Sequence, residues 1–221
     1  MMIQRRRMLG GICALALMPA SLPAVAGAYE DFFYAVKRND ARKVQSLLRL
    51  GFDPNAIEEK RRDSGLILAL REDSMDVFRV LLAAPGIDLD QRSGNGDTAL
   101  MIAAFRANRE AAEALIKKGA AVNRPGWTPL HYAAASGSNE IVKLLLEHHA
   151  YIDAEAPNKT TPLMMAEWRG HIMTVKLLLD EGADPTLRNA LGMDVVDFAR
   201  QGEHPDIVEG MNYRLGRGRA R

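Results

Sequence analysis

Histidine has the widest chemical range of the side chains in this sequence, because it can act as a general base near pH 7 or bind a metal through either ring nitrogen. No two of the histidines lie three or four residues apart, and one adjacent pair cannot point to the same face of a helix. The chain also lacks the G-x-S-x-G, P-loop, G-x-G-x-x-G and H-E-x-x-H motifs. The five histidines are His131, His148, His149, His171 and His204.

The sequence therefore predicts no catalytic residue, no metal site and no cofactor, and we expect a protein that is not an enzyme. The alternative, an enzyme that uses its histidines, requires at least two of them to converge in one pocket. The glycine-rich stretch SGNGD at 93–97 leads into no strand-turn-helix unit, so we interpret it as a tight turn and not as a phosphate-binding loop.

The only cysteine, Cys13, lies in a leading segment, residues 1–28, that resembles a secretory signal peptide. Three arginines are followed there by an apolar run at 8–18 and then by small residues. We expect an exported bacterial protein, periplasmic or beyond, cleaved after Ala26 or Ala28 and left without a thiol. An uncleaved membrane anchor is the alternative, although the apolar run has only about half of the ~20 residues of a spanning helix. The sequence leaves open whether export uses the Sec or the twin-arginine route.

The charge balance favours neither nucleic acid nor a bilayer surface as a partner. The chain has 29 basic and 28 acidic residues, a net charge of +1. Without the three arginines of the leading segment, 26 basic and 28 acidic residues remain, a net charge of −2. Such a small net charge produces no strong field around the molecule. At the other end, residues 213–221 predict a short, flexible basic tail.

The sequence repeats itself. The stretches TALMIAAFRAN, TPLHYAAASGS and TPLMMAEWRGH, which begin at Thr98, Thr128 and Thr161, align without gaps at spacings of 30 and 33 residues. Each is followed at a fixed offset by a second block rich in leucine, such as EIVKLLLEHHAYID at 140–153. Fainter copies precede and follow these three. A period near 33 residues with this pattern is typical of a stacked repeat protein.

The T-P-L-H-x-A motif and its period resemble the ankyrin repeat. The resemblance implies an all-α solenoid of stacked helix-turn-helix units joined by short hairpin loops. It covers residues 29–212 as about six units, of which the terminal ones are degenerate. We expect the protein to be a monomer.

The residues themselves are consistent with such units. The three threonines can cap the first helix of each unit, and Pro129 and Pro162 suit its first turn. Glycines at 51, 119 and 182 suit a left-handed helix end, so His149, which occupies the same position, is predicted to have a positive φ. The second helices are predicted to start after Asp40, Ser74, Asn108, Ser138, His171 and His204.

By its place in the repeat, His131 is predicted to be architectural: the resemblance implies that it hydrogen-bonds the backbone of a neighbouring loop. Tyr132 occupies a position that is apolar in the other units, which predicts a core residue.

The resemblance also implies a concave binding face made of hairpin tips and the exposed ends of the first helices. Arginines and large aromatic residues gather at the corresponding positions, and both types are enriched at interface hot spots. We therefore expect a protein partner with an acidic patch and an apolar anchor. The predicted contact residues are Arg38, Arg71, Phe105, Arg106, Trp127, Trp168 and Arg169. A narrower alternative within binding is an inhibitor or immunity protein that blocks a toxic enzyme.

One hairpin is shorter than the others. The stretch VNRPGWT has three residues fewer between Asn123 and Thr128 than the equivalent spans before Thr98 and Thr161. The shortened tip predicts a notch in the binding face, with Pro125 and Trp127 at its base.

Overall fold

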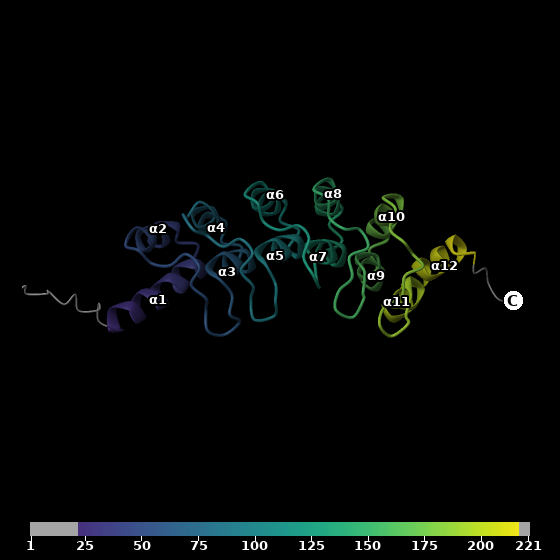
Figure 1. Ribbon diagram of the computed structural model, residues 1–221, viewed down its shortest axis with the longest axis horizontal. Coiled ribbons are helices and arrows are strands. Elements are labelled where there is room, and N and C mark those ends of the chain that lie inside the picture. The colour runs from purple at the N-terminus through teal and green to yellow at the C-terminus, as the bar shows by residue number, and fades with distance from the viewer. Residues whose placement is uncertain (1–21, 217–221) are drawn as a thin grey trace, which may run out of the picture.

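The structure is a computed structural model that describes residues 22–216, with side chains from residue 27 onward. Within this range it contains twelve helices in two rows (Figure 1) and no strand, apart from one isolated bridge between Ile57 and Ser64. The expectation of an all-α solenoid is confirmed. Residues 1–21 of the expected leader and 217–221 of the expected tail lie outside the described residues.

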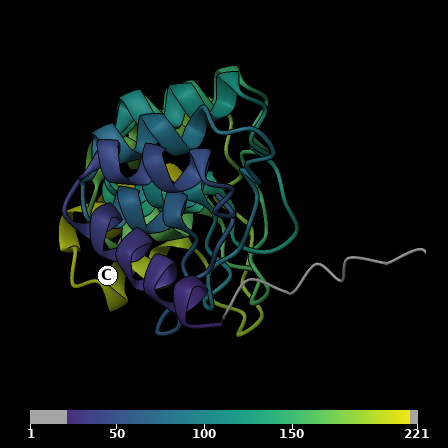
Figure 2. The same ribbon diagram turned by 90° about the vertical axis from the view of Figure 1, so that its left-hand side faces the viewer.

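Each unit contributes one inner and one outer helix, and consecutive inner helices pack against one another. The hairpin loops extend beyond the inner helices, on the side away from the outer helices (Figure 1). The view from the first unit shows the same two layers end-on (Figure 2). The inner helices are α1 (Leu22–Lys37), α3 (Gly65–Arg71), α5 (Ala99–Phe105), α7 (Pro129–Ser136), α9 (Pro162–Trp168) and α11 (Val195–Gln201). The outer helices are α2 (Ala41–Arg49), α4 (Met75–Leu82), α6 (Arg109–Lys117), α8 (Asn139–Glu147), α10 (Ile172–Asp180) and α12 (Pro205–Arg214).

One apolar core runs from Phe32 in α1 to Met211 in α12. It is built from side chains at equivalent positions, each of which packs against the next unit, so that no unit has to bury its apolar face alone. On the inner helices this ladder consists of Leu66, Leu100, Leu130, Leu163 and Val196, and on the outer helices of Leu47, Leu81, Leu115, Leu145, Leu178 and Met211.

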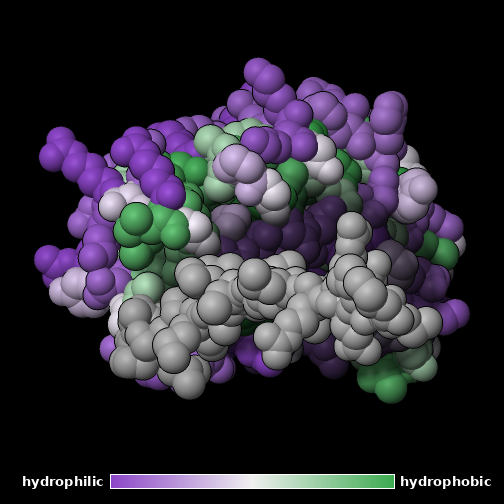
Figure 3. All heavy atoms as spheres, turned by 60° about the vertical axis from the view of Figure 1, so that its left-hand side comes forward, coloured by the Kyte–Doolittle hydropathy of each residue, from purple (hydrophilic) through white to green (hydrophobic). Residues whose placement is uncertain are grey.

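The first unit closes the stack with aromatic side chains. Phe32 stacks on Phe52 with ring centroids 4.5 Å apart, and it contacts Phe33 edge to face. Gly65 makes room for this cluster, since a Cβ there would lie 2.9 Å from the Phe32 ring. Where the end of the stack is uncovered in Figure 3, hydrophilic side chains surround the hydrophobic ones, which is consistent with a capping unit. Helix α1 begins at Leu22 and so includes both expected cleavage sites.

The sequence predicted the helix starts well but not all of their hydrogen bonds. Thr98 and Thr161 accept from backbone N–H groups three residues on, as do Asp40 and Asn108 at the outer helices. Ser74 and Ser138 occupy the N-cap position, yet their side chains make no cap hydrogen bond. His149 has a φ of 62°, which confirms the left-handed conformation predicted for it.

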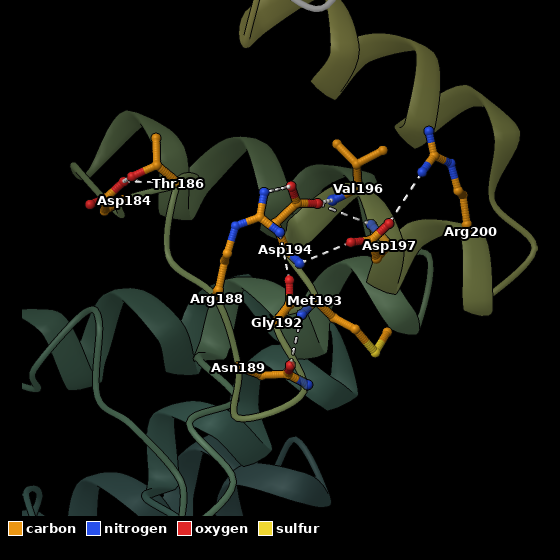
Figure 4. A network of polar contacts seen from close by, with 10 residues as sticks. All are labelled: Asp184, Thr186, Arg188, Asn189, Gly192, Met193, Asp194, Val196, Asp197 and Arg200. Carbon is orange, nitrogen blue, oxygen red and sulfur yellow. Dashed lines mark hydrogen bonds and ion pairs between the residues drawn. The ribbon is translucent and has the colours of Figure 1, made fainter.

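The last hairpin and the start of α11 show how side chains fix a unit's entry into its inner helix (Figure 4). Asp194 accepts from the backbone N–H groups of Val196 and Asp197, and the Asp197 carboxylate accepts in return from Asp194 N. This reciprocal capping satisfies donors that a helix leaves unpaired at its first turn. Arg188 holds the same cap from the hairpin, 3.2 Å from the Asp194 carboxylate.

Candidate functional site

His131 lies fully buried at the start of α7 and serves the architecture, as the sequence predicted. Its Nε2 is 2.9 Å from the carbonyl oxygen of Thr160 in the next hairpin, and its Nδ1 is 3.2 Å from Thr128 N. A carbonyl can only accept, so Nε2 carries the proton and Nδ1 accepts from the Thr128 backbone N–H. Burial lowers the pKa of His131 to about 4, so the ring is neutral at pH 7.

Two further histidines join neighbouring units instead of capping their own helices. His171 Nε2 lies 3.1 Å from the carbonyl oxygen of Ala135, and His204 Nε2 lies 3.2 Å from that of Trp168. Both carbonyls lie at the end of the preceding inner helix, where helices leave acceptors unpaired. Each histidine ring also lies over a glycine of the preceding unit, where a Cβ would be within 3 Å of it.

Tyr132 packs against the core, as predicted, but it is not fully part of it. It is half-buried, and its hydroxyl donates to the carboxylate of Asp97 in the preceding hairpin. That carboxylate is also 2.7 Å from Arg71 Nη2, and Arg71 Nε is 2.9 Å from Asp63. Burial and the bond to Asp97 raise the pKa of Tyr132, so its proton stays in place. This chain of polar contacts joins three successive units.

Arg71 therefore belongs to a different environment from the other predicted contact residues. Its side chain is 22% exposed, and two carboxylates already neutralise its charge. Arg71 is therefore not a free charge on the inner-helix face, although its position in the repeat is close to that of the other arginines.

The shortened hairpin opens a small pocket on the inner-helix face. In the other hairpins a backbone hydrogen bond closes the loop, as from Ser93 N to Asp97 O and from Ala156 N to Thr160 O, but residues 124–127 make no such bond within the described chain. The pocket beside them has a volume of about 200 Å³. Its lining comes from α5, the shortened hairpin, α7 and α9: Phe105, Trp127, His131, Tyr132, Ala135, Met165 and Arg169.

Three of the predicted contact residues meet in this pocket. Phe105 is 48% exposed and contacts Tyr132 edge to face, and Trp127, 36% exposed, contacts His131 in the same way. Arg169 supplies the positive charge of the lining. Trp168 does not line the pocket, but the Arg169 guanidinium stacks over the Trp168 ring, 4.8 Å from its centroid.

The remaining two predicted residues lie on the same face but outside the pocket. Arg106 follows Phe105 directly, is exposed and has no ion pair among the described residues. Arg38 is exposed near the end of α1, with its guanidinium 5.9 Å from the centroid of the Tyr34 ring. Both arginines lie at the C-terminal end of a helix, where a positive charge interacts favourably with the helix dipole and stabilises the helix.

Sequence reasoning missed two features of the units. One is a turn ladder, defined as Asn55, Asp90, Asn123 and Asp153, in which each side chain accepts from a backbone N–H of the next unit at 2.8–3.1 Å. The signal was present, because these residues follow the left-handed position at a constant offset of four. The other is Glu167, a fully buried carboxyl without a hydrogen-bond partner in the described structure.

Between residues 22 and 216, no group of three histidine, cysteine or acidic side chains is arranged to hold a metal ion. Over the same range no helix combines the length and the apolar character that crossing a bilayer requires.

Comparison with known proteins places these units in a family. A family model described as ankyrin repeats in three copies matches residues 32–125 and 121–189. The chain is 36% identical over 160 residues to the human transient receptor potential cation channel subfamily A member 1, covering 67% of this chain and 14% of that protein. It is 29% identical over 182 residues to the mouse B-cell lymphoma 3 protein homolog, covering 79% and 40%. A putative ankyrin repeat-containing protein of Treponema pallidum (strain Nichols) is 26% identical over 189 residues, covering 81% and 61%. The chain thus spans less than two thirds of each of these relatives.

Proposed function

Since the chain belongs to the ankyrin repeat family, whose members are generally non-catalytic modules for protein-protein interaction, we propose that it docks a protein of the bacterial cell envelope on its inner-helix face. The docking site comprises the pocket between α5, α7 and α9 and the exposed arginines beside it.

The pocket is the observation that supports this proposal best. Aromatic side chains line this hollow in the surface together with Arg169, which has no ion pair among the described residues. Aromatic residues and arginine are enriched among the residues that contribute most to binding at protein interfaces. The chain has two tryptophans, and both belong to this site: Trp127 lines the pocket and Trp168 supports Arg169. The neighbouring histidines, by contrast, are occupied by backbone carbonyls of different units.

Affinity capture from extracts of the native envelope tests the proposal. We expect the wild-type protein to retain a discrete partner. The double variant Trp168→Ala/Arg169→Ala should capture at least tenfold less of this partner, and so should Trp127→Ala. The variant Tyr151→Ala is the control, because Tyr151 is 69% exposed in the turn after α8, away from the pocket. Equal capture by all four proteins would show that the partner binds elsewhere.

The proposed location rests on the leading segment alone and has its own test. We expect the protein purified from its native cells to begin at Gly27 or Tyr29, and N-terminal sequencing reads this directly. A chain that still begins at Met1 and fractionates with the cytoplasm would contradict export while leaving the docking proposal intact.

A further inference from the structure

The arginines of the docking face follow a regular pattern along the stack. At one equivalent position, at or just past the end of each inner helix, the six units carry Arg38, Glu72, Arg106, Ser136, Arg169 and Gly202. Arginine therefore recurs in every second unit. Between Arg106 and Arg169 the intervening residue is the neutral Ser136, whereas Glu72 lies between Arg38 and Arg106.

The pocket lies between Arg106 and Arg169, because its lining comes from α5, α7 and α9. Its volume of about 200 Å³ suits one large apolar side chain, given that an engineered cavity of about 150 Å³ binds benzene. No carboxylate belongs to its lining, and the buried His131 is neutral.

The charges around the pocket decide which charged side chains of the partner can lie beside that apolar group. Aromatic rings alone would also suit an ammonium ligand through cation–π attraction. Arg169, however, places its own positive charge in the lining, which opposes a second cation. Asp97, the carboxylate nearest to Tyr132, is already bonded by Tyr132 and Arg71. Glu167 lies two residues before Arg169 in the chain; burial raises its pKa to about 9, so its carboxyl is neutral at pH 7 and does not offset the arginine.

We propose that the docking site takes an extended segment of its partner in which one large apolar side chain enters the pocket and two acidic side chains flank it, one against Arg106 and one against Arg169. This inference rests on the proposed function and specifies the partner's chemistry. An internal segment is favoured over a chain terminus, since a single terminal carboxylate could contact only one of the two arginines.

The geometry of the stack sets the spacing of the acidic residues. Packed helices lie roughly 8–10 Å apart, so arginines two units apart are separated by about 16–20 Å. An extended chain rises about 3.3 Å per residue, which places the two acidic residues about six positions apart and the apolar residue midway.

A titration with short blocked peptides tests this arrangement. The probe is acetyl-Glu-Gly-Ser-Phe-Gly-Ser-Glu-amide, and binding is followed by the fluorescence of Trp127 and Trp168, because the peptide has no tryptophan. We expect saturable binding. Three changes to the peptide should each weaken binding by about fivefold or more, as expected for an exposed ion pair or a lost apolar anchor. These are glutamine in place of both glutamates, alanine in place of phenylalanine, and the two glutamates placed side by side.

Variants of the protein identify the groups on its side. Arg106→Gln and Arg169→Gln should each weaken binding of the glutamate peptide by about fivefold and leave binding of the glutamine peptide unchanged. Arg169→Lys should bind the glutamate peptide more tightly than Arg169→Gln does. Arg42→Gln is the matched control, since Arg42 is exposed on the outer helix α2 and has no ion pair among the described residues. Far-ultraviolet circular dichroism of each variant verifies that it is folded.

Three outcomes would overturn the inference: no binding of the glutamate peptide, equal binding of the glutamine peptide, or tighter binding when trimethyl-lysine replaces phenylalanine and glutamine replaces both glutamates. The last result would identify the pocket as a cation site. Loss of envelope capture by Trp127→Ala together with any of these results would keep the docking site and reject only the proposed partner sequence.

Discussion

Glu167 occupies the position at which the two preceding inner helices have a small alanine, Ala104 and Ala134. Glu167 is fully buried between α9 and α11, has no hydrogen-bond partner in the described structure and is further disfavoured as an anion by Asp194. Burial, with a smaller contribution from Asp194, raises its pKa to about 9. The folded protein therefore holds a proton that the unfolded chain releases near pH 4.5.

This linkage predicts a specific pH dependence. Because the folded state binds the extra proton, the free energy of unfolding should fall as the pH rises from 4.5 to about 9. Glu167→Gln removes the titration, so the variant should gain stability over the wild type by up to about 1.4 kcal/mol per pH unit in this window. Urea unfolding of both proteins at pH 5, 7 and 8.5 measures the difference. A constant difference at all three pH values would show that Glu167 is ionised in the folded protein.

A second residue, Ala107, adopts an unfavourable backbone conformation. Its φ is 53°, in the left-handed region, where the equivalent residues of the next two units are Gly137 and Gly170. A residue with a Cβ costs roughly 1–2 kcal/mol there, so Ala107→Gly should stabilise the protein by about 0.5–1 kcal/mol after the entropy of glycine is subtracted. Urea unfolding provides the measurement, and Ala114→Gly inside α6 should have the opposite sign. Destabilisation by both changes would refute this explanation.

The units themselves are held in register by polar contacts as well as by the leucine ladders. Asn123 is a member of the turn ladder: its side chain donates to His149 O at 2.7 Å and accepts from Tyr151 N at 2.8 Å. Two backbone groups at the start of the next turn thus depend on one side chain. The interface between units is where such contacts add to the stability of the whole stack.

Replacing this side chain should weaken the stack. We expect Asn123→Ala to lower the free energy of unfolding by about 1–2 kcal/mol, because both bonds are lost and their partners are left half-satisfied. Asn158→Ala is the matched control, since the Asn158 side chain bonds only Thr160 N, two residues away, and is exposed. Equal effects of the two variants in urea unfolding would contradict a role of Asn123 between units.

The sequence predicted these elements because the same local signals recur in several units: a capping threonine, a proline in the first turn, and leucines at a fixed offset. The pocket could not be predicted in the same way. The repeat alignment predicts Phe105, Trp127 and Arg169 on one face, but it does not show that they line a single pocket, which depends on how their side chains pack. The shortened hairpin predicted a notch with Pro125 and Trp127 at its base, and the pocket beside this hairpin has Trp127 but not Pro125 in its lining. The pairing of Arg71 with two carboxylates depends on side-chain conformations that a repeat alignment does not contain.

At the scale of the whole molecule, the described chain is a single elongated stack in which each unit contacts its neighbours (Figure 1). The surface of such a stack is a row of similar units that becomes specific only where a unit departs from the pattern. The departures coincide at one place: the shortened hairpin, the two tryptophans and the neutral Ser136 at the equivalent position between Arg106 and Arg169. The docking site therefore depends on the correct stacking of three units, those with the inner helices α5, α7 and α9.

Site-specific photocrosslinking in native cells tests most directly that this face binds a partner. A benzoylphenylalanine introduced in place of Phe105, at the pocket, should form a discrete covalent adduct with one envelope protein after irradiation, whereas the same group in place of Tyr151 should form none. Adducts from position 151 but not from position 105, or none from either, would contradict the assignment of the docking site.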